Sequence, residues 1–267
     1  MDHFDSWLGA RQYADTTRRV YRIYASRLCA FTDPATATTN DLLDFMEVLP
    51  GTAPSKRAAR KALVAYYRYL GVDPNPAEQL PRVAEPQRLP RPLTEPEHRE
   101  WVLASHRLGG THELAGMLMA TTGARTGEVR VARWEDFSLI APGYWRVRGK
   151  GARRRGPIWR QQPLHPEMLA LLQRQLIVSP WLFPSPDGSY LSDYRMRKLI
   201  LEISAEAGLG HVTGHRIRHS VATIALSKTG DLRAVQSLLG HRSVQSTQMY
   251  TEVLPDRLHE VIHALPT

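Results

Sequence analysis

The sequence predicts a mainly α-helical protein with a small β-hairpin, divided into two domains. A chain of 267 residues is long enough for about two domains. Six of the 22 residues from 72 to 93 are proline, which interrupts any long helix or strand there. Apolar residues recur at helical spacing on both sides of this segment. We therefore predict a helical domain over residues 1–80, a linker over 81–93 and a second domain over 94–267.

Three helices are expected in the first domain. In the first of them, Val20, Tyr24, Leu28 and Phe31 fall on one helical face. The second begins with a residue that can cap a helix and carries several leucines. The three predicted ranges are Asp15–Phe31, Thr39–Leu49 and Ser55–Leu70.

The third of these helices combines an apolar face with a basic one. Ser55 is the expected N-cap, Gly71 the expected stop, and Leu70 is expected to point inward. Four basic side chains share the opposite face, which either contacts phosphates or is simply solvated. These are Lys56, Arg57, Arg60 and Lys61.

The second domain begins with a capping box, Thr94 to Glu97, and then alternates helices with one hairpin. The expected strands are Tyr144–Arg148 and Arg154–Trp159, joined through Gly149, Lys150 and Gly151. The expected helices are 94–106, 111–122, 166–178, 192–207, 214–228, 231–239 and 243–250, followed by an amphipathic stretch at 254–265.

The charge favours a polyanionic partner. The net charge is +9 and the isoelectric point is about 9.9. The excess is +2 over residues 1–83 and +7 over residues 84–267. The segment Trp145–Arg160 has seven basic residues, no acidic residue and two tryptophans, which is typical of nucleic-acid binding.

Several classes of protein are excluded or disfavoured. No apolar run approaches the ~18 residues of a membrane span, and the first residues do not resemble a secretory signal. The single cysteine, Cys29, rules out an internal disulfide framework and is expected to fill the core. We expect a cytoplasmic protein without a membrane partner.

Four short segments contain the residues that could carry chemistry. His215 and Arg218 lie three residues apart and share a helical face, where imidazole and guanidinium suit an oxyanion better than a metal. Arg125 and Glu128 have the same spacing, so Glu128 can orient Arg125 or a neighbour. The other two segments are the turn that carries Lys150 and the stretch from His241 to Tyr250.

Together these residues suit phosphodiester transfer without a metal or cofactor. Two guanidiniums match the charge that builds up on a pentacoordinate phosphorus. Tyrosine, with a pKa near 10, is only about one part in a thousand ionised at pH 7, so it needs a proton acceptor such as His215. Lys150 can protonate the departing oxygen. The product is a phosphotyrosine ester.

The chain resembles the tyrosine recombinase (phage integrase) family. The matching segments are TGARTGEVRVARWEDF, GKGARRRGPI, HRIRHSVAT and LGHRSVQSTQMYTEV, in the family's order across about residues 94–251. The resemblance implies a core-site-binding first domain and a recombinase catalytic domain. It implies Glu128 as the acid supporting the first arginine, and the following catalytic set: Arg125, Lys150, His215, Arg218, His241 and Tyr250.

The resemblance also implies how the protein works. Two domains clamp a duplex core site, and four protomers on DNA exchange strands through a Holliday junction, while the free protein is a monomer or weak oligomer. The segment after Tyr250 packs on a neighbouring protomer or on its own domain. We expect a short form without an arm-binding domain, a phage or mobile-element role, and possible help from a directionality factor. Further backbone contacts are expected from Arg146, Arg148, Arg153, Arg154 and Arg155.

Three alternatives remain open from the sequence. A type IB topoisomerase would use similar chemistry to relax DNA, and a recombinase could instead resolve plasmid or chromosome dimers. A DNA-binding repressor could keep the fold without catalysis. The segment His259 to His263 matches H-E-x-x-H, a zinc hydrolase pattern, but it lies on a helix that needs its apolar face for packing, so no metal is expected.

Overall fold

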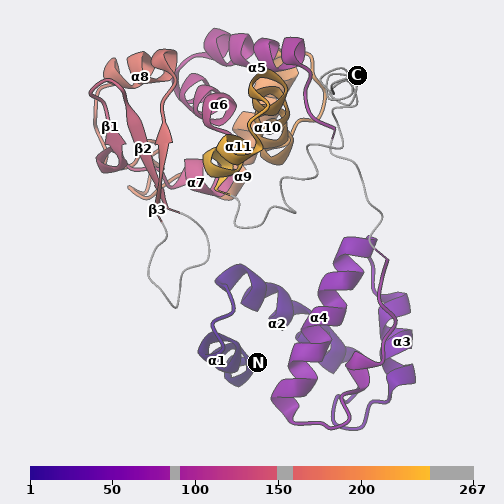
Figure 1. Cartoon of the computed structure of the whole chain (residues 1–267). Helices are drawn as coiled ribbons and strands as arrows, with labels where there is room; N and C mark the ends of the chain where they lie inside the picture. The colour runs from indigo at the N-terminus through magenta and orange to yellow at the C-terminus, as the bar shows by residue number, and fades with distance from the viewer. Residues whose placement is uncertain (85–90, 149–158, 241–267) are drawn as a thin grey trace, which may run out of the picture. The chain divides into compact units, whose positions relative to one another are not determined.

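The computed structural model describes residues 1–84, 91–148 and 159–240. The chain divides into two compact units, Met1–Arg88 and Leu89–Thr267 (Figure 1). The described part of each unit is mainly helical, and the second also contains a small sheet. The predicted fold class is therefore confirmed.

The first unit is a helical bundle built around one apolar core. Helices α2 and α4 pack against each other, and Leu28 and Leu63 meet Phe4 and Tyr67 in its interior. Thr38 caps α3 by accepting from the main-chain nitrogen of Asp41 at 3.3 Å. Its elements are α1 (Asp2–Ala10), α2 (Asp15–Phe31), α3 (Thr39–Val48), α4 (Ala53–Leu70) and a 3₁₀ turn, η1 (Pro76–Glu78).

Helix α4 differs from the prediction at its N-terminal limit and in the exposure of its last residue. The helix begins at Ala53, so Ser55 lies inside the first turn and Thr52 holds the N-cap position. Proline at N2 does not oppose this start, because the first turn needs no hydrogen bond from it. Leu70 is 39% exposed rather than inward. Gly71 ends the helix with a left-handed φ of 72°, as predicted.

Two other predictions about the first unit have different outcomes, because the apolar face of α2 is buried only in part and the core position of Cys29 is wrong. Only Tyr24 and Leu28 of the expected apolar face of α2 are buried, whereas Val20 and Phe31 are exposed. Cys29 is exposed too, although its sulfur lies 3.2 Å from the hydroxyl of Tyr66. Helical spacing identified the correct face, but α2 is longer than the core that it covers.

The proline-rich segment is held by both units along its described residues. Ala77 and Leu80 are buried in the core of the first unit. At its other end, Leu93 is buried in the second unit, and its main-chain nitrogen donates to Ser220 Oγ at 2.7 Å. Part of this segment is therefore buried in the cores of the two units.

The helices of the second unit surround a second core, which includes Trp101, Leu118, Ile200 and Ile217. Helices α5 and α6 form a close pair, and α6 also contacts α8, α9 and α10. The helices are α5 (Glu95–Leu108), α6 (Gly110–Thr122), α7 (Thr126–Arg130), α8 (Pro166–Gln173), α9 (Asp193–Glu206), α10 (Gly214–Thr229) and α11 (Leu232–Leu239), with a 3₁₀ turn, η2 (Trp134–Asp136).

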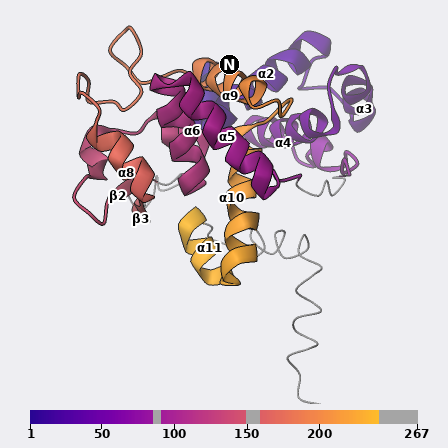
Figure 2. The ribbon, with the colours of Figure 1, turned by 90° about the horizontal axis from the view of Figure 1, so that it is seen from above.

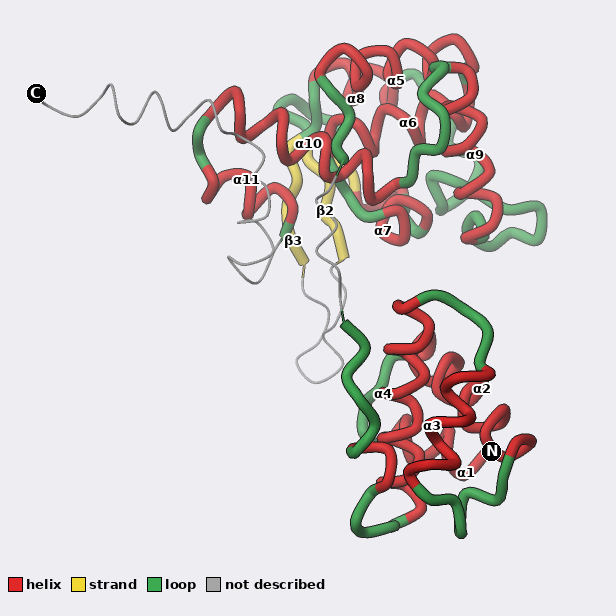
Figure 3. Tube along the Cα trace, turned by 90° about the vertical axis from the view of Figure 1, so that its right-hand side faces the viewer, coloured by secondary structure: helices red, strands yellow, loops and turns green. Residues whose placement is uncertain are grey.

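The sheet is an antiparallel meander with strand order β1-β2-β3 (Figure 1), and its longer strands β2 and β3 are labelled in Figure 3. Strand β2 matches its predicted limits, with Trp145 and Val147 pointing into the core. The second predicted strand is placed differently, because β3 begins at Trp159, and residues 154–158 lie outside the described part. The strands are β1 (Phe137–Ser138), which the sequence did not reveal, β2 (Tyr144–Arg148) and β3 (Trp159–Pro163).

Two predicted helices end elsewhere or lie outside the described residues. Helix α8 stops at Gln173, five residues before the predicted limit, and residues 176–178 form an exposed apolar stretch. The predicted helix 243–250 and the amphipathic stretch 254–265 are not described. Within the described ranges, no helix is both long and apolar enough to span a membrane.

Two glycines allow close approach where α6, α7, α10 and α11 meet. A Cβ on Gly214, the first residue of α10, would lie 2.0 Å from Thr126 Oγ1 in α7. A Cβ on Gly123, which ends α6, would lie 2.9 Å from Leu239 in α11. Figure 2 shows α10 and α11 side by side. The ends of these four helices therefore form one tightly packed junction.

Candidate active site

The junction of α6, α7, α10 and α11 contains the predicted residues that the structure describes. Arg125 precedes α7, and His215 and Arg218 lie in the first turns of α10. The positive charges of Arg218 and Arg125 both act on His215, which shows that the three groups share one electrostatic environment. The structure therefore brings together Arg125, His215 and Arg218, which are 93 residues apart at the extremes.

Glu128 is the centre of the first hydrogen-bond group. Its Oε1 accepts from Arg125 Nη1 at 3.0 Å, and its Oε2 accepts from the Arg125 main-chain nitrogen at 2.8 Å. The expected pairing of Glu128 with Arg125 is thus present. The same two oxygens also accept from Arg160 Nη1 and Nη2, at 3.0 and 2.9 Å.

Arg218 is 3% exposed and is held by two main-chain oxygens. Its Nη1 donates to Gly123 O at 2.8 Å, and its Nη2 donates to Leu239 O at 2.7 Å. The guanidinium therefore joins the ends of α6 and α11 to α10. Such a planar group, fixed by two carbonyls, needs no reorganisation to meet a charged oxygen.

His215 is paired with a second histidine. Its Nε2 lies 2.6 Å from Nε2 of His219, one helical turn later, and the rings meet edge to face. One ring must donate and the other accept, so a single proton lies between them. Burial lowers the pKa of His215, and the charges of Arg218 and Arg125 lower it further. His215 is therefore neutral near pH 7 and able to take a proton.

The remaining predicted catalytic residues lie outside the described residues. These are Lys150, His241 and Tyr250. Their attachment points are described: Arg148 ends β2 and Trp159 starts β3 on either side of the segment with Lys150, and Gly240 immediately precedes His241. The H-E-x-x-H pattern at His259–His263 is also outside, and the described residues contain no cluster of three metal-type ligands.

Sequence reasoning missed one residue of this site and undervalued another. Arg160 lies within the basic run, but nothing in its spacing distinguishes it from its basic neighbours. His219 lies four residues after His215, at helical spacing, but this spacing alone does not assign it a role at the site. Both lie directly against predicted site residues in the structure.

On the basic face of α4, the two arginines bind main-chain oxygens, and the two lysines differ in their exposure. Arg60 donates from Nε to Leu80 O and from Nη2 to Glu78 O, both at 2.9 Å, and Arg57 Nη1 donates to Ala84 O at 2.9 Å. These two arginines thus fasten the proline-rich segment to α4. Lys56 is half-buried and Lys61 is exposed on the same helix.

The basic hairpin also departs from the simple nucleic-acid interpretation. Trp145 is 1% exposed and stacks on Phe137 at 5.4 Å between ring centroids, so it is a core residue and not a base-contacting one. Trp159 is exposed, with the guanidinium of Arg146 4.7 Å from the centroid of its ring. Arg148 is exposed, whereas Arg153, Arg154 and Arg155 lie outside the described residues.

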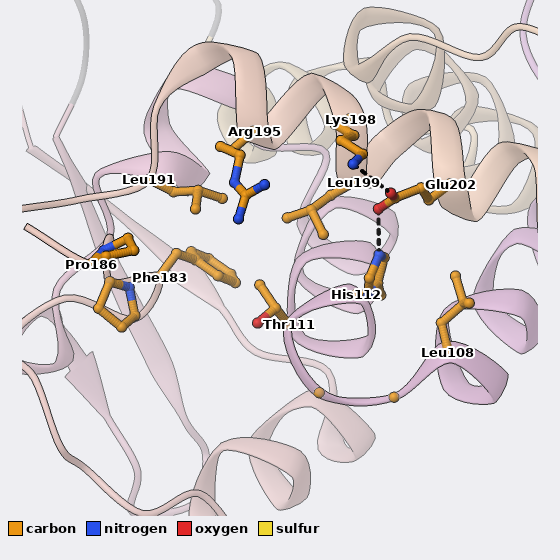
Figure 4. Close-up of a pocket in the computed structure, with 13 residues that line it drawn as sticks. Leu108, Thr111, His112, Phe183, Pro186, Leu191, Arg195, Lys198, Leu199 and Glu202 are labelled. Carbon is orange, nitrogen blue, oxygen red and sulfur yellow. Dashed lines mark hydrogen bonds and ion pairs between the residues drawn. The ribbon is translucent and has the colours of Figure 1, made fainter.

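A separate pocket of about 560 Å³ lies between the α5–α6 turn, the 183–191 loop and α9 (Figure 4). His112 and Lys198 flank Glu202 there, at 2.8 and 3.7 Å from its carboxylate oxygens. Arg195 lines the same space. None of the described site residues at the α6–α7–α10–α11 junction lines this pocket, so it is distinct from the candidate active site.

Comparison with known proteins decides the family. The model of the phage integrase family matches residues 93–257. The chain belongs to this family. Tyrosine recombinase XerA of Pyrococcus furiosus is 31% identical over 270 residues, which cover 98% of this chain and 92% of its relative. Tyrosine recombinase XerC of Oceanobacillus iheyensis is 30% identical, and the match covers 85% of this chain and 80% of the XerC chain.

This tyrosine recombinase is an enzyme that cleaves and rejoins DNA strands, and its reaction is site-specific recombination. Solved structures share its fold. XerH recombinase, bound to palindromic difH substrate in a post-cleavage complex, gives a TM-score of 0.77 at 22% identity, covering 96% of this chain and 81% of that one. A λ integrase dimer bound to a COC′ core site gives a TM-score of 0.74 at 18% identity, and the match covers 93% of this chain and 75% of the integrase chain.

Proposed function

We propose that this recombinase cuts a short duplex core site by attack of the Tyr250 oxygen on the scissile phosphorus. The P–O5′ bond breaks as the P–O bond to tyrosine forms, which leaves a 3′-phosphotyrosine and a free 5′-hydroxyl. His215 takes the phenol proton, and Lys150 gives a proton to the departing O5′. The observation that carries this proposal is the convergence of Arg125, His215 and Arg218 at one junction.

The described geometry fits the charge changes of this reaction. A diester carries one negative charge, and its transition state concentrates more on the non-bridging oxygens. Two guanidiniums, with Arg218 fixed by carbonyls and Arg125 held by Glu128, meet that added charge. The lowered pKa of His215 keeps it unprotonated near neutral pH, as a proton acceptor must be. In this proposal, His241 supplies a further contact to the phosphate.

The first unit is proposed to bind the core site together with the second. Lys56 and Lys61 on α4, and Arg146 and Arg148 on β2, are the described candidates for backbone contacts. Several solved structures with this fold contain DNA, and one of them is a λ integrase tetramer bound to a Holliday junction. We extend that arrangement to this chain as a tetramer that assembles on two core sites and exchanges strands pairwise.

The biological role that we propose is the resolution of chromosome or plasmid dimers. The sequence alone predicts phage or mobile-element integration, with dimer resolution as the alternative. The relatives of about 30% identity that cover nearly the whole chain carry Xer names, and these favour dimer resolution. Integration and the use of a directionality factor remain the competing proposal.

Covalent trapping tests the chemistry and finds the site. Nicked suicide duplexes drawn from the flanking genome are incubated with the purified protein, and adducts are separated under denaturing conditions. Wild type is expected to form a DNA–protein adduct at Tyr250, and Tyr250→Phe is expected to bind the same duplexes without forming one. Adducts that persist in Tyr250→Phe would overturn the assignment of the nucleophile.

A plasmid assay separates the two roles. One plasmid carries two direct copies of the trapped site, and a second pair of plasmids carries two unlike attachment sites. Dimer resolution predicts that the first plasmid yields two smaller circles with the recombinase alone. Recombination restricted to the unlike pair would favour integration. Relaxation of plasmids that lack the site would point instead to topoisomerase activity.

A further inference from the structure

Two arginines share the carboxylate of Glu128, but they do so unequally. Arg160 occupies it as a fork, with Nη1 on Oε1 at 3.0 Å and Nη2 on Oε2 at 2.9 Å. The side chain of Arg125 makes one contact, from Nη1 to Oε1 at 3.0 Å. The parallel fork is the stronger geometry for an arginine–carboxylate pair. Glu128 is therefore bound more firmly to Arg160 than to the Arg125 side chain.

The exposed fractions of the side chains also set Glu128 and Arg160 apart from Arg125. Glu128 is 6% and Arg160 14% exposed, whereas the Arg125 side chain is 39% exposed. Burial alone would raise the pKa of Glu128. The hydrogen bonds and charge of Arg160, followed by those of Arg125, instead lower it below the usual value. The carboxylate thus stays ionised inside the protein, mainly because of Arg160.

Arg160 is itself held from two sides. Its Nε donates to Gln162 Oε1 at 3.3 Å, and Gln162 in turn donates to the main-chain oxygen of Thr122 at the end of α6. Its Cδ would lie only 2.9 Å from a Cβ on Gly240, so its stem runs along the residue just before His241. Arg160 thus joins β3 to the end of α6, the start of α7 and the end of α11.

We propose that Arg160 is a positioning residue for Arg125. By taking both oxygens of Glu128 in a fork, it limits the carboxylate to a single bond with the Arg125 side chain. That bond aims the guanidinium while leaving it exposed to a phosphate. Without Arg160, the carboxylate would be open to a fork with Arg125, which would pull this guanidinium from the substrate. This inference rests on the proposed function, in which Arg125 contacts the scissile phosphate.

The test compares single-turnover cleavage of the trapped duplex by Arg160→Met, Arg160→Lys and wild type. Arg160→Lys keeps a positive charge beside the buried Glu128 and so guards against loss of folding, but an ammonium cannot form the fork. Arg107→Met is the matched control, because Arg107 also lies between two carboxylates, those of Glu100 and Glu206, on the surface of α5. Duplex affinity and circular dichroism are measured on every variant.

Arg160→Met and Arg160→Lys are expected to cleave about 10²-fold more slowly at saturating duplex, with duplex affinity within about twofold of wild type. Arg107→Met is expected to cleave like wild type. On a duplex with a neutral methylphosphonate at the scissile position, the deficit of both Arg160 variants should shrink by at least about tenfold, because a guanidinium has no anionic oxygen to stabilise there. A purely structural role would leave the deficit the same on both duplexes.

A double-mutant cycle completes the test. If Arg160 acts through Arg125, the double variant Arg125→Met/Arg160→Met is no slower than Arg125→Met alone. Additive deficits, or wild-type cleavage by both folded Arg160 variants, would overturn the positioning role and leave the proposed function intact. Wild-type cleavage by Arg125→Met would instead overturn the proposed function itself.

Discussion

Arg218 Nη2 donates to the main-chain oxygen of Leu239 at 2.7 Å, two residues before His241. The same guanidinium holds Gly123 O, two residues before Arg125. One buried side chain therefore sets the separation between three segments that carry predicted catalytic residues. Arg218 has a structural role in the free protein in addition to the proposed role at the phosphate.

Replacing Arg218 is expected to cost both stability and activity. In Arg218→Lys, one ammonium cannot reach both carbonyls in the planar arrangement, so one buried oxygen loses its partner. The free energy of unfolding should fall by about 1–3 kcal/mol, measured by urea denaturation. The control Arg197→Lys, at an exposed position of α9, should change it by less than about 0.5 kcal/mol. Equal unfolding curves for the two variants would contradict the bridging role.

Acid is expected to destabilise the second unit through His215. Its pKa lies below the usual 6.5 in the folded protein, so the unfolded chain binds a proton that the folded protein does not. This contribution to stability is complete above pH 6.5 and is lost as the pH falls through the folded value. His98, whose pKa is also lowered by burial, acts in the same direction.

The loss of stability at acid pH can be measured as the free energy of unfolding, by urea denaturation between pH 5 and pH 8. His215→Asn should flatten it in part, and His98→Asn/His215→Asn should flatten it further. Proton NMR of the His215 ring gives an independent check, because Arg125→Met removes one nearby positive charge and should raise the pKa of His215. An unchanged titration in that variant would mean that the two groups are not coupled.

The contact between α10 and α7 is expected to tolerate no added methyl group. In Gly214→Ala the new Cβ would meet Thr126 Oγ1, which should lower the free energy of unfolding by about 1–3 kcal/mol. Thr126→Ala removes that oxygen and should restore part of the loss. Gly127→Ala is the control, since a Cβ there meets nothing within 4 Å. Thermal denaturation that ranks the two glycine variants in the opposite order would refute this packing argument.

The two halves of the basic face of α4 should respond differently to substitution. Arg60→Met removes two hydrogen bonds to the carbonyls of Leu80 and Glu78 and should lower the stability of the first unit by about 1 kcal/mol. Lys61→Met should leave stability unchanged but weaken DNA binding. The slope of log K against log salt should fall by about 0.9 for one lost phosphate contact. A salt slope identical to that of wild type would remove Lys61 from the interface.

The parts of the fold that the sequence predicted are those marked by local signals. Gly71 and Gly240 end helices with φ values of 72° and 64°, which favour glycine, and the Thr94 capping box is present. The start of α4 was predicted wrongly, because two local signals compete there. Ser55 suits an N-cap, yet the chain begins α4 two residues earlier, because Pro54 fits the first turn equally well.

The site was predictable where its residues lie in one helical turn and less so across elements. His215 with Arg218, and Arg125 with Glu128, were identified by spacing. Arg160 is 32 residues from Glu128, and only the folded sheet brings the two together. Alternation along a strand gives the face on which a side chain lies, but it does not identify a partner on another element.

The way the chain enters the second unit has a mechanical consequence. Arg216 Nε donates to Arg91 O at 2.9 Å, and Ser220 Oγ accepts from the nitrogen of Leu93 at 2.7 Å. Both side chains belong to α10, the helix that carries His215 and Arg218. Tension on the connecting polypeptide is therefore passed to α10 through these two hydrogen bonds, as well as to α5 through the chain itself, so a load on the connector reaches the helix to which the proposed function assigns His215 and Arg218.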